Sequence, residues 1–264
     1  MTQTIQKIKF EKPIKQKKKL ISVIIPIYNE EKTIARVLKK IPNQYPMEIL
    51  IIDDGSTDNS VNKIVNVKEK NIKIISHAKN KGYGSSIQTG FEHASGDILV
   101  TIDSDGQHRP REIHRLVEPI INDEADLVVG SRYLGECQYQ VPLHTKAGEF
   151  MIKVMLKILF GQPVGNNQSG FRAFRRKDIN KFKNLIYSDF GLCTEILFKA
   201  ALSDLRIKEV PVTIKKRQHG TSRVKISRIA LSIFSCLFIY TLKRFKALRF
   251  IPNSIINALK RSNL

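Results

Sequence analysis

The sequence of 264 residues contains no tryptophan and few acids: 24 Asp and Glu stand against 45 Lys and Arg. Its three cysteines, Cys137, Cys193 and Cys236, are odd in number, scattered and without the spacing of metal ligands. We therefore expect a reducing, cytosolic setting. The N-terminus is polar and rich in lysine, so we expect no secretion signal.

The C-terminal part also lacks a long uncharged apolar run. Its most apolar stretch, residues 229–242, is bounded by Arg228 and Lys243. As a helix these fourteen residues would extend about 21 Å, short of a hydrocarbon core of about 30 Å. We predict a helix that lies in the membrane interface rather than one that spans it. Residues 150–160 are similar in character and either help to receive a lipid tail or form an ordinary core helix.

The positive charge is concentrated at the two ends of the chain. The formal net charge is +21; residues 1–20 contain seven lysines and one glutamate, and residues 210–264 contain twelve Lys and Arg and no acid. The middle of the chain is therefore close to neutral. A nucleic-acid-binding protein more often carries a basic stripe over its folded domain, so we expect no nucleic-acid partner. Basic arms indicate an anionic membrane surface, where each well-placed cation contributes about 1 kcal/mol.

Two predicted buried strands end in carboxylates. Residues 98–102 form an apolar, β-branched run that is followed by Asp103 and Asp105, and residues 47–52 form a second run that also ends in acids. In open α/β sheets the carboxyl ends of the strands are where ligands bind. A divalent cation would relieve the repulsion between the two acids, and Gln107 offers a further carbonyl oxygen. The alternative is that Asp-Ser-Asp-Gly forms only a turn.

Helical and strand-like patterns alternate along the chain. The predicted strands are residues 20–27, 47–52, 72–76, 98–102, 126–129 and 207–214, and the predicted helices include residues 31–40 and 85–94. This alternation is a βαβ arrangement. We therefore predict an α/β fold with a mostly parallel sheet and helices on both faces.

Five motifs occur in order: Ile25-Pro26-Ile27-Tyr28-Asn29-Glu30, Asp53-Asp54-Gly55-Ser56-Thr57-Asp58, Asp103-Ser104-Asp105-Gly106-Gln107, Gly130-Ser131-Arg132 and Ser169-Gly170-Phe171-Arg172-Ala173-Phe174. With them the chain resembles family-2 glycosyltransferases of the GT-A fold, most of all the branch of dolichyl-phosphate mannosyl- and glucosyltransferases. The resemblance implies a Rossmann-like GT-A domain over residues 20–225. A basic N-terminal arm, residues 1–19, would precede it, and a basic, apolar, amphipathic helical extension at the membrane surface, residues 226–264, would follow.

The resemblance also implies an activity. The enzyme would be an inverting hexosyltransferase that moves a sugar from a nucleotide diphosphate sugar to a polyprenyl (dolichyl-type) phosphate, with Mg or Mn as cofactor. Asp103, Asp105 and Gln107 would hold the metal, which would neutralise the charge that develops on the departing diphosphate. The protein would work as a peripheral or interfacial protein on the cytoplasmic face of the membrane.

Particular residues are implied for the substrates. Those implied for substrate binding are Pro26, Tyr28, Glu30, Ile52, Asp54, Ser104, Arg132, Arg217 and Arg223. Catalysis is implied for Asp103, Asp105, Arg132 and Arg217, the arginines because a guanidinium is planar and always charged. Plainer alternatives exist: Glu30 favours the N-terminus of the next helix, Asp54 shapes a turn, and Arg217 and Arg223 belong to a solvated basic loop.

Two positions depart from the mannosyltransferase pattern. Gly191 stands four positions before Glu195, where a lysine is common. Near Thr145 a basic residue for the acceptor phosphate is expected, and only His144 and Lys146 are at hand. The donor therefore stays open among GDP-mannose, UDP-glucose and UDP-N-acetylglucosamine.

Glu195 has two interpretations that depend on the acceptor. If the acceptor is a hydroxyl of a glycan or lipid, a general base is needed and Glu195 is a candidate. If the acceptor is a phosphate, its oxygen is already anionic and Glu195 is structural, which is the interpretation we favour. An alternative from a different class is a basic membrane or nucleic-acid adaptor without catalysis.

Overall fold

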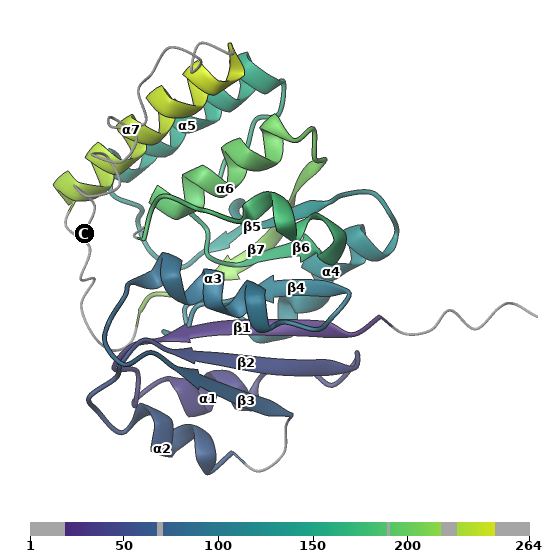
Figure 1. Cartoon of the computed structure of the whole chain (residues 1–264), viewed down its shortest axis with the longest axis vertical. Coiled ribbons are helices and arrows are strands. Elements are labelled where there is room, and N and C mark those ends of the chain that lie inside the picture. The colour runs from purple at the N-terminus through teal and green to yellow at the C-terminus, as the bar shows by residue number, and fades with distance from the viewer. Residues whose placement is uncertain (1–18, 68–70, 189–190, 218–225, 246–264) are drawn as a thin grey trace, which may run out of the picture.

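The computed structural model describes residues 19–67, 71–188, 191–217 and 226–245 (Figure 1). Arg223, almost all of the predicted N-terminal arm and the residues after 245 lie outside this part of the chain. The described strands are β1 (Ile21–Ile27), β2 (Met47–Asp53), β3 (Ile72–Ser76), β4 (Ile98–Thr101), β5 (Leu127–Cys137), β6 (Arg172–Arg175) and β7 (Ile207–Ile214).

The seven strands form one sheet in the order β3-β2-β1-β4-β6-β5-β7. The pairs β1–β2, β1–β4, β2–β3 and β5–β7 are parallel, whereas β6 is antiparallel to both β4 and β5. The sheet is therefore mostly parallel, as predicted. The short strand β6 is the strand of this sheet that the sequence patterns did not predict.

Helices cover both faces of the sheet. They are α1 (Ile34–Lys39), α2 (Ser60–Val65), α3 (Tyr83–His93), α4 (Ile113–Ile121), α5 (Leu143–Phe160), α6 (Gly191–Leu202) and α7 (Ile226–Arg244), with 3-10 turns η1 (Pro110–Glu112) and η2 (Arg176–Phe182). Figure 1 shows α1 and α2 at one end of the view and α5, α6 and α7 stacked at the other.

Alternate strand residues supply two separate cores. Ile24 and Leu50 pack with residues of α3, α5, α6 and α7, whereas Ile25 and Ile51 pack with residues of α1, α2 and α4. All seven residues of β1 are buried, because both of its faces are covered. The predicted α/β fold with helices on both faces is confirmed.

Helix α7 packs against the body of the domain through one face. Ile233, Cys236 and Tyr240 are buried in the core that α6 also lines. The Tyr240 hydroxyl donates to Glu195 on α6 at 2.8 Å. Residues 226–264 are predicted as an extension at the membrane surface; the part of them that forms α7 packs against the domain. In the described ranges, helices fall short of the length and apolarity that crossing a bilayer requires.

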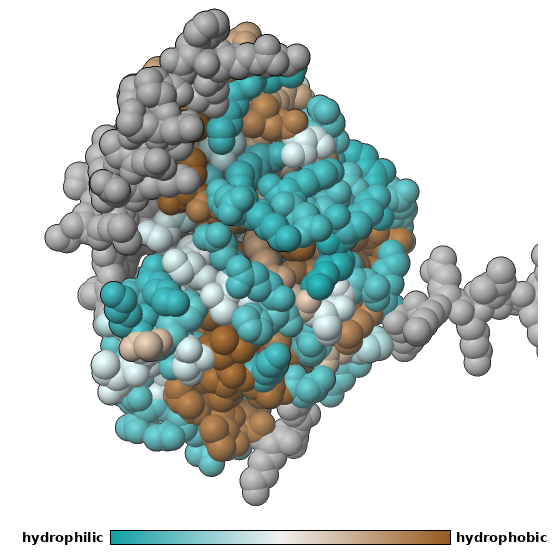
Figure 2. All heavy atoms as spheres, in the orientation of Figure 1, coloured by the Kyte–Doolittle hydropathy of each residue, from teal (hydrophilic) through white to brown (hydrophobic). Residues whose placement is uncertain are grey.

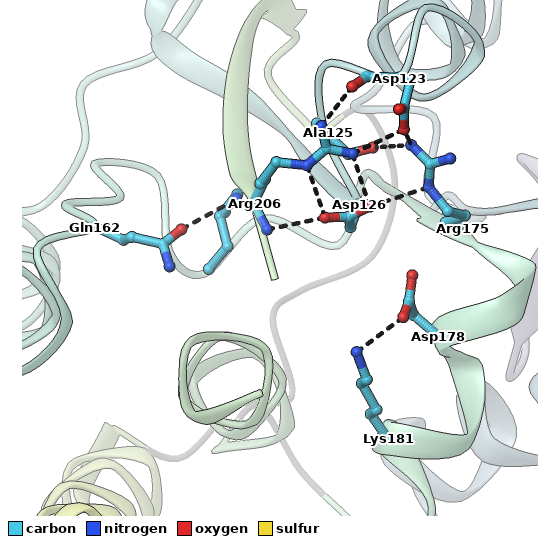
Figure 3. Close-up of polar contacts among 9 residues, drawn as sticks. Asp123, Ala125, Asp126, Gln162, Arg175, Asp178, Lys181 and Arg206 are labelled. Atoms are coloured by element: carbon cyan, nitrogen blue, oxygen red, sulfur yellow. Dashed lines mark hydrogen bonds and ion pairs between the residues drawn. The ribbon is translucent and has the colours of Figure 1, made fainter. Parts of the chain in front are cut away.

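A charged cluster closes the sheet at the edge where β5 and β7 begin (Figure 3). Arg206 donates to both carboxylate oxygens of Asp126, from Nε at 3.0 Å and from Nη2 at 3.1 Å. Asp123 accepts from Arg206 and from Arg175, at 2.8 and 2.6 Å. The hydrogen bonds from Arg206 lower the pKa of Asp126 to about 2. This cluster ties the start of β7 to the start of β5, on the edge opposite to the predicted site.

Candidate active site

The topology gathers several chain segments at one edge of the sheet. The parallel strands β1, β2 and β4 all end there, which is where ligands bind in sheets of this kind. Since β6 runs the other way, Gly170, just before it, lies at the same edge. The end of β7 is also here, because Ile214 bridges to His108 and the Lys215 N–H donates to the Gln107 carbonyl at 2.8 Å.

Asp103 lies against the loop that precedes β6. The Thr101 hydroxyl donates to the Gly170 carbonyl at 2.7 Å and holds this loop in place. A Cβ at Gly170 would lie 2.6 Å from each carboxylate oxygen of Asp103, so glycine is required for this approach. Burial and the nearby Asp105 raise the pKa of Asp103 to about 7, opposed by a hydrogen bond with Tyr83. The carboxylate is therefore held close to another negative charge.

Asp105 is paired with an arginine from the far end of the domain. Arg217 Nη2 donates to Asp105 Oδ2 at 2.6 Å, and the Gln107 N–H donates to Asp105 Oδ1 at 3.0 Å. The Gln107 side-chain amide donates to the Lys215 carbonyl at 3.0 Å. The two segments predicted to meet at the diphosphate, residues 103–107 and the chain after β7, are thus in direct contact.

The oxygen atoms of this site are suitable ligands for a hard divalent cation. Asp103 and Asp105 offer carboxylate oxygens, and Arg217 already supplies the positive charge that Asp105 needs. Across the residues that the structure describes, no three side chains of His, Cys, Asp or Glu form a ready cage for a metal. Magnesium in nucleotide sites usually takes one or two carboxylates and completes its shell with water and substrate phosphates. The donor set agrees with that type of site. Ser104, between the two acids, is buried.

Arg132 is held by a glutamate that the sequence patterns did not single out. Its Nη2 donates to both carboxylate oxygens of Glu149 at 2.7 Å, and Tyr133 donates to the same carboxylate at 2.5 Å. Both members of the ion pair are buried, with 9% and 2% of the side chain exposed. Arg132 lies within β5, which continues past the predicted end at residue 129 as far as Cys137, and it connects this strand to α5. Its Nε has no partner in the described part of the chain.

The residues predicted for the nucleoside begin at the end of β1. Pro26 lies within β1 opposite Ile52 of β2, and both are buried. The Ile52 side chain is fully buried in the core beneath α3, so a ligand at this edge could reach only its backbone. Tyr28 is half-buried just beyond the strand.

Glu30 organises the turn that leads into α1. Its carboxylate accepts a hydrogen bond from Thr33 Oγ1 at 2.6 Å, and its N–H donates to Ser60 Oγ at 2.7 Å. Burial raises the pKa of Glu30, and the Thr33 hydroxyl opposes that shift. These contacts support the plainer alternative, a role in shaping the start of the helix, and leave a nucleoside contact as a prediction.

Asp54 is buried and fully engaged by the protein. Its Oδ1 accepts from the Lys81 N–H at 2.9 Å and lies 2.7 Å from His77 Nδ1, and its Oδ2 accepts from the Gly82 N–H at 2.8 Å. The carboxylate thereby holds the loop between β3 and α3. The structure therefore assigns Asp54 a loop-shaping role, and its predicted hydrogen bond to a base or ribose stays a prediction.

Glu195 is structural. It is fully buried, and its carboxylate accepts from the backbone N–H of Ile186 at 2.8 Å, the N–H of Tyr187 at 3.2 Å and the Tyr240 hydroxyl at 2.8 Å. Burial raises its pKa, and these hydrogen bonds oppose the shift. A carboxylate enclosed in this way has no access to an acceptor hydroxyl, which supports the structural interpretation of Glu195; a role as general base stays the alternative for a hydroxyl acceptor.

The chain belongs to glycosyl transferase family 2, whose model matches residues 22–182, and it is a glycosyltransferase. A UDP-N-acetylglucosamine–dolichyl-phosphate N-acetylglucosaminyltransferase of Methanococcus voltae is 34% identical over 82% of this chain and 94% of its own length. A dolichol-phosphate mannosyltransferase of Pyrococcus furiosus is also 34% identical, over 78% of this chain and 59% of its own length.

A solved structure shares the fold. Glucosyl-3-phosphoglycerate synthase from Mycobacterium tuberculosis, crystallised with Mn²⁺, UDP-glucose and phosphoglyceric acid, superimposes with a TM-score of 0.66. It is 22% identical and covers 86% of this chain and 79% of its own. At this identity the similarity supports the GT-A fold alone.

Proposed function

We propose that this protein transfers a sugar, with inversion, from a nucleotide diphosphate sugar to a polyprenyl phosphate. The observation that carries the proposal is the convergence of Asp103, Asp105 and Arg217 at the carboxyl edge of the sheet. Two acids and a guanidinium at one point match the needs of a metal-bound diphosphate. The acceptor class is supported by the names of the Methanococcus and Pyrococcus relatives.

The cofactor in this proposal is Mg or Mn, held by Asp103, Asp105 and Gln107. When bound, it would supply a Lewis acid for the diphosphate oxygens. Arg217 would move from Asp105 to a phosphate oxygen and would there stabilise the negative charge of the same leaving group. Arg223 is proposed for the same role by its place in the motif, although it lies outside the described residues.

The bond changes balance without a proton transfer. A phosphate oxygen of the acceptor forms a bond to the anomeric carbon of the sugar, and the bond from that carbon to the donor diphosphate breaks. The electron pair leaves with the nucleoside diphosphate. No general base is needed because the attacking oxygen is anionic, and the burial of Glu195 agrees with this.

The lipid acceptor is proposed to approach from the side of α5 and α7, at the cytoplasmic face of an anionic membrane. Exposed apolar side chains line both helices: Leu143, Phe150, Met151 and Ile158 on α5, and Phe234 and Phe238 on α7. Figure 2 shows apolar residues at the end of the molecule where these helices lie, and a second apolar area over β3. Arg132 and Glu149 connect α5 to the catalytic edge.

The test is a donor and acceptor panel. The protein is incubated with Mn²⁺, labelled GDP-mannose, UDP-glucose or UDP-N-acetylglucosamine, and a short polyprenyl phosphate, with the matching polyprenol as the control acceptor. We expect a lipid-linked sugar from one donor with the phosphate and none with the alcohol. Product from the alcohol alone would favour the hydroxyl-acceptor alternative, and no product from any donor would count against the proposal.

A further inference from the structure

A strongly basic cavity lies behind the loop that carries Asp103 and Asp105. It has a volume of about 350 Å³ and lies between α1, residues 106–111 and Lys215. Five cations from three separate parts of the chain line it: Arg36, Lys40, Arg109, Arg111 and Lys215. No acidic side chain is among its lining residues in the part of the chain that the structure describes.

The cations are close enough to affect one another. Burial, followed by repulsion from Lys215, Arg36 and Arg111, lowers the pKa of Lys40. The nearest acid that contacts a lining cation is Glu136, whose Oε2 lies 3.9 Å from Arg109 Nη2, and both side chains are largely exposed. A contact of this kind contributes little, so the positive charge of the cavity is not neutralised by the described protein groups.

A buried polar atom in the wall of the cavity also lacks a partner. His108 lines the cavity with only 6% of its surface exposed, and its Nδ1 makes no hydrogen bond to any described residue. Its Nε2 is directed to Asp103, at 3.7 Å from Oδ2. A buried polar group without a partner is unfavourable, so this part of the cavity wall carries a cost that the described residues do not offset.

The location favours a soluble ligand over a lipid headgroup. Helix α1 packs on the face of the sheet opposite to α5, α6 and α7, and the exposed apolar side chains of the proposed membrane surface lie on α5 and α7. Arginine matches phosphate oxygens because its guanidinium donates two parallel hydrogen bonds. Three arginines and two lysines around one cavity therefore suit an anion with more than one phosphate group.

We propose that this cavity is a second anion site, separate from the donor site, which binds a soluble ligand that carries two or more phosphate groups. The proposal does not depend on the sugar or acceptor of the reaction. Two residues that line the cavity, Gly106 and His108, belong to the chain segment that carries Asp103 and Asp105. A ligand in the cavity would therefore stabilise the conformation of that segment.

The test uses inorganic pyrophosphate as the probe, measured by isothermal titration calorimetry in EDTA so that no metal-dependent binding contributes. The variant is Lys40→Ala/Arg111→Ala, and Lys39→Ala is the matched control, an exposed lysine of α1 that does not line the cavity. We expect binding to weaken about tenfold for each cavity cation removed and to stay unchanged in Lys39→Ala. Mn²⁺-dependent binding of UDP or GDP should be unchanged in both variants.

Several outcomes would overturn the proposal. One is the absence of pyrophosphate binding in the wild type, and another is equal weakening by Lys39→Ala, which would mean unspecific charge attraction. Loss of Mn²⁺-dependent nucleotide binding in the double variant would make the cavity part of the donor site. Asp105→Asn separates the two proposals further, because it should remove the metal-dependent binding and leave the pyrophosphate site in place.

Discussion

Asp105 holds a central position because it contacts the chain after β7 and is expected to contact the metal. We predict that Asp105→Ala lowers turnover by about 10² to 10³-fold, the usual cost of losing one group that stabilises developing charge. Metal-dependent nucleotide binding, measured by calorimetry with Mn²⁺, should be lost at the same time. Glu92→Ala, an exposed acid on α3, is the control and should keep both. Retained metal-dependent binding in Asp105→Ala would refute the metal assignment.

Glu195 allows structure and catalysis to be separated by one conservative change. Glu195→Gln keeps the size of the side chain but weakens its hydrogen bonds to Ile186, Tyr187 and Tyr240. We expect the free energy of unfolding to fall by about 1–3 kcal/mol, the cost of imperfectly satisfied buried groups. The kcat of the folded protein and its pH profile should be unchanged.

A catalytic base would give the opposite pattern. In that case Glu195→Gln would lower kcat by about 10² to 10⁴-fold with little change in stability. Urea unfolding and initial rates, measured on the same preparation, distinguish the two results.

At the scale of elements, the charged cluster that joins the starts of β5 and β7 predicts that the stability of the protein depends on pH. The pKa of Asp126 is about 2 in the folded protein, below its ordinary value near 4, because Arg206 donates hydrogen bonds to it. The stabilisation that the ionised Asp126 contributes is therefore fully present above about pH 4 and is lost as the pH falls through about 2.

The measurement is urea unfolding of Asp126→Asn against wild type. We expect the variant to be less stable than the wild type by about 1–2 kcal/mol at pH 7, a modest effect because Arg206 is partly exposed. This difference in the free energy of unfolding should shrink as the pH approaches about 2. Glu92→Gln is the control and should show no such narrowing. A difference that stays constant from pH 7 to pH 2 would mean that the charge of Asp126 is not involved.

The elements also show how far the sequence predicts this protein. Residues 72–76 and 207–214 match β3 and β7, because short β-branched runs between polar segments have few other interpretations. The strand β6, Arg172–Arg175, was missed since its four residues include two arginines and show no apolar run. Its place between β4 and β5 is decided by pairing with distant strands rather than by its own sequence.

In the candidate active site, too, some features follow from the local sequence and others from contacts between distant residues. The acids after β4 could be found from the sequence because a strand end fixes where they lie. The partners of those residues could not. Glu149 binds Arg132 and Tyr83 binds Asp103 across long stretches of chain, and neither has a local pattern that distinguishes it from other residues of its helix. The loop-holding contacts of Asp54 and Glu195 could not be found from the sequence either, because their partners are backbone N–H groups of other segments.

At the scale of the whole molecule, apolar exposure and positive charge predict reversible binding to anionic membranes. Phe234 and Phe238 are 66% and 56% exposed on α7. We expect Phe234→Ser/Phe238→Ser to weaken co-sedimentation with phosphatidylglycerol vesicles by about a hundredfold or more, since each of the two buried rings contributes about 1.5–3 kcal/mol. Binding should also fall between about 0.05 and about 0.5 M NaCl because salt screens the basic residues; the Debye length shortens from about 14 Å to about 4 Å over this range.

The control for that experiment is Val65→Ser. Val65 is 67% exposed on α2, on the other face of the sheet, so its loss should leave vesicle binding unchanged. Equal loss in both variants would indicate a general effect of surface apolarity. Unchanged binding in the double variant would exclude α7 as the membrane-facing element.

The contact between Arg217 and Asp105 has a consequence for the order of events. In the proposed metal site, a divalent ion at Asp105 would share the carboxylate with the guanidinium of Arg217, whose Nη2 lies 2.6 Å from Oδ2. Repulsion between the two cations would lower the apparent affinity for the metal, and by reciprocity a bound metal would weaken the contact between Asp105 and Arg217. Arg217 would thus compete with the metal for Asp105, and metal binding would make the arginine more available to a phosphate.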